Sequence, residues 1–94
     1  MPEHIDFVET LTIERSLTAG CTITVQSVQP TPDEDGNVAP WDVVVILEAY
    51  DTANPSNRVR CMGAQSSTQI PSSGTWRITA KPSKSPSACF LDIG

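Results

Sequence analysis

The stretch WDVVVILEAY, residues 41–50, is the most apolar segment of the sequence. Its Val and Ile residues are branched at Cβ, which favours the extended backbone of a strand. Successive side chains of a strand point to opposite faces, and here both faces are apolar. We therefore expect a central strand that is covered on both sides. One face is formed by Trp41, Val43, Val45, Leu47 and Ala49, and the other by Val44, Ile46 and Tyr50.

Alternation of apolar and polar residues continues from this segment through most of the chain. Ser, Pro, Gly and Asn cluster between the alternating segments, and these clusters predict turns and loops. Among them, residues 51–57 are expected to form a turn. The alternation predicts strands at residues 5–13, 21–26, 41–50, 58–61, 75–80 and 89–93, and a loop with a short edge segment at 65–74.

These strands predict an all-β fold, a small antiparallel β-sandwich or a partly open barrel of about six to seven short strands. The 94 residues suffice for one small core and not for a second. We therefore expect one domain over residues 1–94, with an N-terminal segment that can be extended. Hydrophobic residues make up 38% of the chain and charged residues 18%, which is not typical of a disordered chain.

The net charge of −5 argues against non-specific attraction to nucleic acid or to anionic membranes. The charges are unevenly distributed along the chain. Residues 1–51 contain ten acids and one base, which gives −9, and residues 52–94 contain five bases and one acid, which gives +4. The two halves can neutralise each other within the fold or between neighbouring molecules. We therefore expect protein partners, including copies of the chain itself.

Cys21, Cys61 and Cys89 are an odd number of cysteines at long spacings, unlike the framework of a small secreted protein. We expect reduced side chains that pack as small hydrophobes, and one disulfide with a free thiol is the alternative. Glu3 and Asp6 stand where a secretory signal would be basic, so we expect synthesis in the cytoplasm without a signal peptide. No apolar run is long enough to span a membrane.

The sequence offers no convincing catalytic or metal site. His4 is the only histidine, and the cysteines lack the close pairs of a zinc site. Residues 33–37 resemble the start of a calcium loop, but the Gly and Glu that such a loop requires further on are missing. Asp42 and Glu48 would lie roughly 20 Å apart along a strand, too far for paired-carboxylate catalysis. We expect no enzymatic activity, no cofactor and no metal.

Arg58 and Arg60 are two residues apart, so they project from the same face of a strand. Arg77 lies on the outward face of a later predicted strand. If the two strands pair, the three guanidinium groups form a docking patch for an acidic partner. The alternative is that the arginines form ion pairs within the fold. The acids available for such pairs include Glu48, Glu14 and Glu9.

Val44, Ile46, Tyr50 and Phe90 lie opposite the expected core face of their strands and are expected to form a second apolar face. A sandwich of this size has one interior, so these side chains are covered either by loops of the chain or by another molecule. Both alternatives stay open. If another molecule covers them, Ile5 and Phe7 of the N-terminal segment are expected to contribute to the same contact.

We expect a non-enzymatic structural or assembly protein that packs on a larger protein scaffold. Accessory proteins of virus particles, such as capsid cement or decoration proteins and tail components, fit this description and reside in the virion. The alternative is a small acidic cytoplasmic module that binds and inhibits a partner protein by occluding it. We expect a homo-oligomer or an assembly subunit, with neither nucleic acid nor membrane as a partner. The residues expected to contact partners are Arg58, Arg60, Arg77, Ile5, Phe7, Val44, Ile46 and Phe90.

Overall fold

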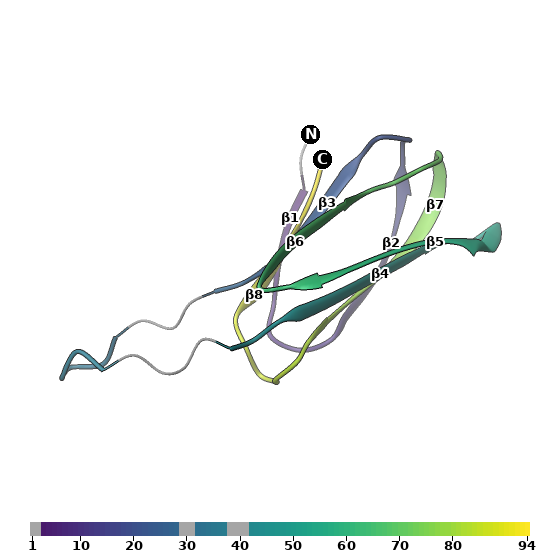
Figure 1. The fold of residues 1–94 in the computed structure, drawn as a ribbon. Coiled ribbons are helices and arrows are strands. Elements are labelled where there is room, and N and C mark those ends of the chain that lie inside the picture. The colour runs from purple at the N-terminus through teal and green to yellow at the C-terminus, as the bar shows by residue number, and fades with distance from the viewer. Residues whose placement is uncertain (1–2, 29–31, 38–41) are drawn as a thin grey trace.

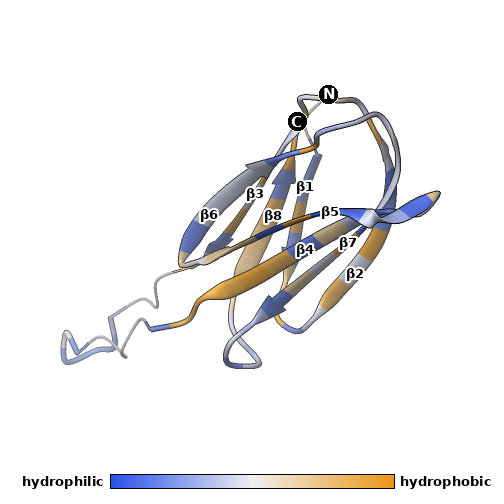
Figure 2. Cartoon of the chain, turned by 45° about the vertical axis from the view of Figure 1, so that its right-hand side comes forward, coloured by the Kyte–Doolittle hydropathy of each residue, from blue (hydrophilic) through white to orange (hydrophobic). Residues whose placement is uncertain are grey.

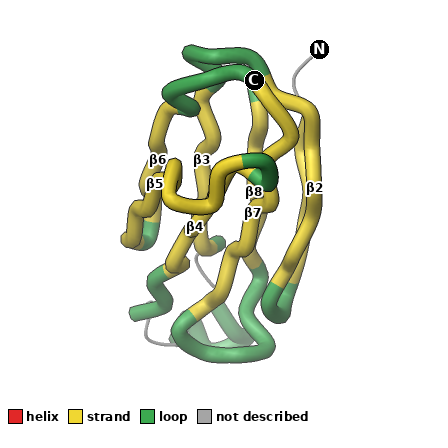
Figure 3. Tube along the Cα trace, turned by 90° about the vertical axis from the view of Figure 1, so that its right-hand side faces the viewer, coloured by secondary structure: helices red, strands yellow, loops and turns green. Residues whose placement is uncertain are grey.

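Eight β-strands and no helix make up the regular structure of the described residues (Figures 1 and 3). The computed structural model describes residues 3–28, 32–37 and 42–94. The strands are β1 (Glu3–Phe7), β2 (Leu11–Leu17), β3 (Thr22–Ser27), β4 (Val45–Asp51), β5 (Asn54–Gly63), β6 (Gln65–Gln69), β7 (Gly74–Pro82) and β8 (Cys89–Ile93).

The strands form two antiparallel four-stranded sheets, in the orders β1-β8-β3-β6 and β2-β7-β4-β5. The first strand therefore pairs with the last, the second with the seventh, the third with the sixth and the fourth with the fifth. This nested pairing is the jelly-roll arrangement of two Greek keys. The expected antiparallel β-sandwich is confirmed, with eight strands in place of six to seven.

Two predicted strands differ from the structure. The alternating segment 5–13 is two strands in different sheets, β1 and β2, with a turn at 8–10 between them. Both strands direct odd-numbered residues to the same core, so the alternation continues through the turn and conceals it. The predicted strand over residues 41–50 begins only at Val45, and Trp41 lies outside the described residues.

The connections around β5 and β6 also differ in part. The predicted turn at 51–57 is too long, because β5 begins at Asn54 and forms a tight hairpin with β4. The edge segment expected within residues 65–74 is β6, which lies at the edge of its sheet. Ile70, directly after β6, is buried and belongs to the core.

One core lies between the two sheets, and the predicted central strand contributes to it as expected. Val45, Leu47 and Ala49 of β4 are buried, and β4 lies between β7 and β5 in its sheet. Trp76 of β7 is fully buried, and its Nε1 donates a hydrogen bond to the Ser72 carbonyl at 3.0 Å. Removal of these side chains from water is the main force that holds the sheets together.

Consecutive edge strands, β1 and β2, are joined by an ion pair across the two sheets. Arg15 Nε and Nη2 donate to the two carboxylate oxygens of Glu3, each at 2.9 Å. These bonds lower the pKa of the Glu3 carboxyl below its ordinary value. Both residues share the inward parity of their strands, and an inward-pointing charge protects an edge strand against pairing with another chain.

The connection between β3 and β4 is described in part. Its described part, residues 32–37, stands apart from both sheets in Figure 1, and the longest dimension of the molecule is 51 Å. Asp33 Oδ1 accepts hydrogen bonds from the backbone N–H groups of Asp35 and Asn37, both at 2.9 Å. Gly36 has a φ of +82°, which few other residues adopt without strain. We call this self-contained turn the acidic tip.

Candidate protein-binding surfaces

The three arginines selected from the sequence all lie on the outer face of the sheet β2-β7-β4-β5. The strands β5 and β7 do not pair, because β4 lies between them. The expected patch therefore does not form by direct strand pairing. The register instead places Arg77 and Arg58 on either side of Tyr50, and Arg60 beside Glu48.

Two of the arginines form ion pairs within the fold. Arg77 Nη2 lies 2.6 Å from Glu14 Oε1, and this hydrogen bond raises the pKa of the Arg77 guanidinium. The Arg77 guanidinium carbon also lies 5.9 Å from the centre of the Tyr50 ring, within the range of a cation–π contact. Arg60 Nε lies 3.3 Å from Glu48 Oε1. The alternative of ion pairs within the fold is therefore correct for Arg77 and Arg60. Because both pairs are exposed, they contribute little to stability.

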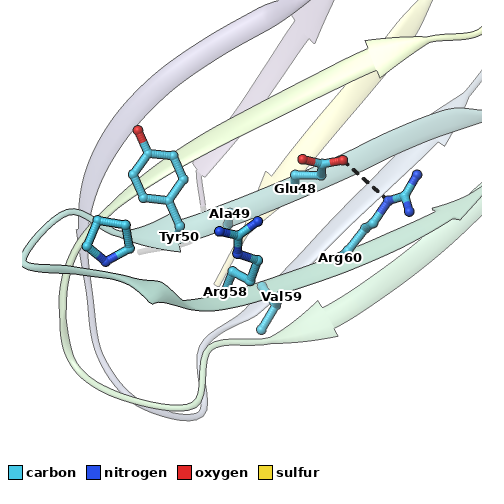
Figure 4. Close-up of a pocket in the computed structure, with 7 residues that line it drawn as sticks. Glu48, Ala49, Tyr50, Arg58, Val59 and Arg60 are labelled. Carbon is cyan, nitrogen blue, oxygen red and sulfur yellow. Dashed lines mark ion pairs between the residues drawn. The ribbon is translucent and has the colours of Figure 1, made fainter.

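Arg58 differs from the other two, because it has no ion pair or hydrogen bond with any described residue. It lines an open surface cavity of about 530 Å³ on the β4–β5 hairpin, which we call the Arg58 pocket. In Figure 4, Arg58 lies between Tyr50 and the Glu48–Arg60 pair. The pocket is lined by Glu48, Ala49, Tyr50, Pro55, Arg58, Val59 and Arg60.

Phe90 lies on the outer face of the other sheet, where backbone register places three further apolar residues next to it. The pairing of β1, β8 and β3 continues past the strand ends, with hydrogen bonds from Val28 N to Ala88 O and from Ser87 N to Val8 O. Val8, Ala88 and Val28 therefore form the row that follows Phe90. The exposed fraction is 52% for Val8 and 46% for Val28, which is high for large apolar residues.

A second apolar group lies on the outer face of the sheet β2-β7-β4-β5. Ile46 of β4 is half-buried and pairs in register with Met62 of β5, whose exposed fraction is 59%. Val44 stands two residues before Ile46 and is also half-buried. Figure 2 shows this apolar part of β4 at the end of the strand that faces the β3–β4 connection.

Val44 and Ile46 therefore lie on one outer face of the sandwich, and Phe90 lies on the opposite one. The expectation of a single second apolar face is wrong, because these residues belong to strands of different sheets. Both groups nevertheless lie at the same end, where the β3–β4 connection leaves the sheets. We call them together the apolar end, which consists of Val8, Val28, Ala88 and Phe90 on one face and Val44, Ile46 and Met62 on the other.

The structure directs Ile5 and Phe7 of β1 toward the interior. Phe7 belongs to the buried core, and Ile5 is partly buried and packs against it. The sequence predicts that this N-terminal segment can be extended and contacts partners, but its pairing with β8 makes it part of the sandwich. We therefore assign Ile5 and Phe7 to the core and leave them out of the candidate surfaces.

His4 and two carboxylates form a small polar cluster on the outer face beside Phe90. His4 Nδ1 lies 2.5 Å from Asp92 Oδ1, and His4 Nε2 lies 3.0 Å from Asp6 Oδ1. The hydrogen bond to Asp92, and then that to Asp6, raise the pKa of His4 above its ordinary value. The centre of the His4 ring lies 5.0 Å from that of Phe90. The cluster attaches β1 to β8, since His4 and Asp6 belong to β1 and Asp92 belongs to β8.

Among the described residues, no three His, Cys, Asp or Glu side chains are arranged to hold a metal ion. The three cysteines are free, as expected, and only Cys89 is buried, which raises the pKa of its thiol. The part of the chain that the structure describes contains no helix with the length and apolar character of a membrane span.

The sequence matches no protein-family model, and it matches no curated protein. The function proposed for this chain therefore rests on its own surfaces, namely the Arg58 pocket and the apolar end.

Proposed function

We propose that this chain is a non-enzymatic structural protein that packs on a larger protein scaffold and on copies of itself. The observation that supports the proposal is the apolar end. Single exposed apolar side chains are normal on a protein surface, but groups of them mark contact sites. Here the strand register gathers such residues on both faces of one end of the sandwich.

Association would bury these side chains without making or breaking a covalent bond. Val8 and Val28 are about half exposed, so burying the remainder of each is worth roughly 1 kcal/mol. Phe90, Ile46 and Met62 would add to this contribution. The polar residues around the apolar end would form the rim of the contact.

The most suitable role is that of an accessory protein of a virus particle, such as a capsid cement or decoration protein or a tail component. This part of the proposal rests on analogy, because jelly-roll sandwiches recur in viral capsid and lectin domains. Packing on a scaffold of repeated subunits would also suit a chain with contact surfaces on both faces.

Sedimentation velocity over a range of concentrations tests the proposal. We expect the wild-type chain to form oligomers, and Val8→Ser combined with Val28→Ser to weaken this association about tenfold or more. Ala19→Ser combined with Ala53→Ser, at exposed turns of the opposite end, is the matched control and should associate like wild type. A monomeric wild-type chain, or equal association of both variants, would contradict the proposal.

The second candidate is a small acidic binding or inhibitor module that occludes a partner protein. The Arg58 pocket favours it, since an unpaired guanidinium beside an aromatic ring suits a protein hot spot. A chain that stays monomeric and binds its partner through Arg58 would support this alternative over the first.

A further inference from the structure

On the outer face of the sheet β2-β7-β4-β5, Arg58 and Lys81 are the bases without an ion pair among the described residues, and Lys81 pairs in register with Ile46, away from the Arg58 pocket. Arg77 is paired with Glu14, and Arg60 with Glu48, whereas Arg58 has no acid partner among the described residues. A free guanidinium presents a planar fork of N–H donors that matches a carboxylate. The pocket therefore favours an acidic occupant.

The dimensions of the pocket restrict the occupant further. A volume of about 530 Å³ is large enough for a few side chains and too small for a folded domain. Tyr50 and Pro55 contribute apolar surface, and an occupant that covers them would reduce access of water and strengthen a charge contact with Arg58. A short acidic turn fits these conditions.

The chain itself contains such a turn. In the acidic tip, Asp33 is engaged in the hydrogen bonds that hold the turn together. The carboxylates of Glu34 and Asp35 have no partner among the described residues and are exposed. The tip thus offers two free carboxylates on a preformed turn.

The tip and the pocket lie at opposite ends of the molecule. In Figures 1 and 2 residues 32–37 lie beyond one end of the sandwich and the β4–β5 hairpin lies at the other. A tip therefore meets the pocket of a second copy and not its own. Contact between two different surfaces of identical chains joins them head to tail.

We propose that Glu34 and Asp35 of one copy dock at Arg58 of the next, so that the chain assembles head to tail. This inference rests on the proposed function in taking the chain to be an assembly subunit, and it adds which surfaces meet. The occupant of the pocket is a second copy, and its acidic tip is the segment that binds.

Charge reversal tests this contact in the full-length chain by sedimentation velocity at low salt. Arg58→Glu alone, and Glu34→Lys combined with Asp35→Lys, should each weaken association at least about fivefold. The chain with all three substitutions should regain association, because the charges are exchanged and not removed. Ser67→Asp combined with Gln69→Glu, on the exposed outer side of β6 and away from both surfaces, has the same net charge as Arg58→Glu and is the matched control.

The outcomes separate this contact from the apolar end. Association that depends on Val8 and Val28 but not on Arg58 would overturn the head-to-tail contact and leave the proposed function standing. Loss of association in the Ser67/Gln69 control, or failure of the triple variant to recover, would also overturn it. Recovery in the triple variant would support it, since a general loss of folding cannot be reversed by further substitutions.

Discussion

The protonation of His4 affects the contact between two strands, because His4 of β1 bonds to Asp92 of β8. Asp92 and Asp6 raise its pKa, so the folded chain favours the charged imidazole more than the unfolded chain does. The contribution to stability is therefore complete below the ordinary pKa of 6.5 and is lost as the pH rises through the raised value.

We expect the melting temperature to fall as the pH rises from about 6 to about 8. His4→Gln should remove most of this dependence, because the chain has no other histidine. Thermal unfolding followed by circular dichroism measures the effect. Equal pH dependence of the variant and the wild type would contradict the role assigned to His4.

Trp76 combines full burial with one hydrogen bond to the backbone at Ser72. Trp76→Phe keeps an aromatic ring but leaves the Ser72 carbonyl without this donor. We expect the free energy of unfolding to fall by about 1–3 kcal/mol, measured by urea titration. Trp76→Ala should cost more, about 3–5 kcal/mol, because it also opens a cavity. A Trp76→Phe variant as stable as wild type would show that the hydrogen bond is replaced by another group.

At the scale of residues, the alternation of apolar and polar residues predicted well to which face a side chain points. It predicted poorly which other residues that side chain contacts. The inward side of β4 and the outward position of Arg58 both follow from period two. The exposure of Val8 and Val28 does not, because it depends on register between strands far apart in the sequence. Whether Arg58 has an acid partner depends on the same long-range register.

The edge strands β1 and β2 carry charges that oppose pairing with strands of other molecules. Glu3 of β1 and Arg15 of β2 form an inward ion pair on one side of the sandwich. We expect Arg15→Leu to speed amide hydrogen exchange in β1 and to increase aggregation, because β1 loses its attachment to β2 and its protection. Hydrogen exchange with mass spectrometry measures the first effect and light scattering the second.

Arg60→Leu provides the control for that prediction. It removes an arginine of another edge strand, β5, whose ion pair with Glu48 lies on the outer face. Exchange in β1 should be unchanged in this variant. If both variants alter β1 equally, general surface charge and not the Glu3–Arg15 pair would be responsible.

At the scale of elements, the sequence predicted most strands but neither their number nor their order. The turn at 8–10 is concealed because its flanking strands keep the same parity on opposite sides of one core. Strand order depends on which segments pair across the whole chain, and alternation is a local property that holds no such information. The jelly-roll topology therefore emerges only from the structure.

At the scale of the whole molecule, the acidic first half and the basic second half of the chain partly neutralise each other. Three ion pairs join an acid of the first half to a base of the second, namely Glu14–Arg77, Glu48–Arg60 and Asp42–Lys84. Most of the positive second half is thereby neutralised within the fold. Glu34 and Asp35 of the acidic tip and Arg58 are among the charges without an ion pair within the described residues, and they lie at opposite ends.

The two proposed contacts should respond differently to salt. Raising NaCl from about 0.05 M to about 0.5 M screens exposed charges and should weaken the contact between the acidic tip and the Arg58 pocket. Burial of the apolar end should change little, because it does not depend on charge. Association of the wild type should therefore fall with salt to a residual level set by the apolar end.

Variants show which contact causes the salt-dependent part of the association and which contact causes the residual part. Arg58→Glu should associate to that residual level at low salt already and show little further dependence. Val8→Ser combined with Val28→Ser should keep the salt dependence and lose the residual level. Sedimentation velocity of the three chains at both salt concentrations measures all of these quantities. A residual level that falls with Arg58→Glu, or a salt dependence unchanged by it, would mean that the two surfaces do not act as separate contacts.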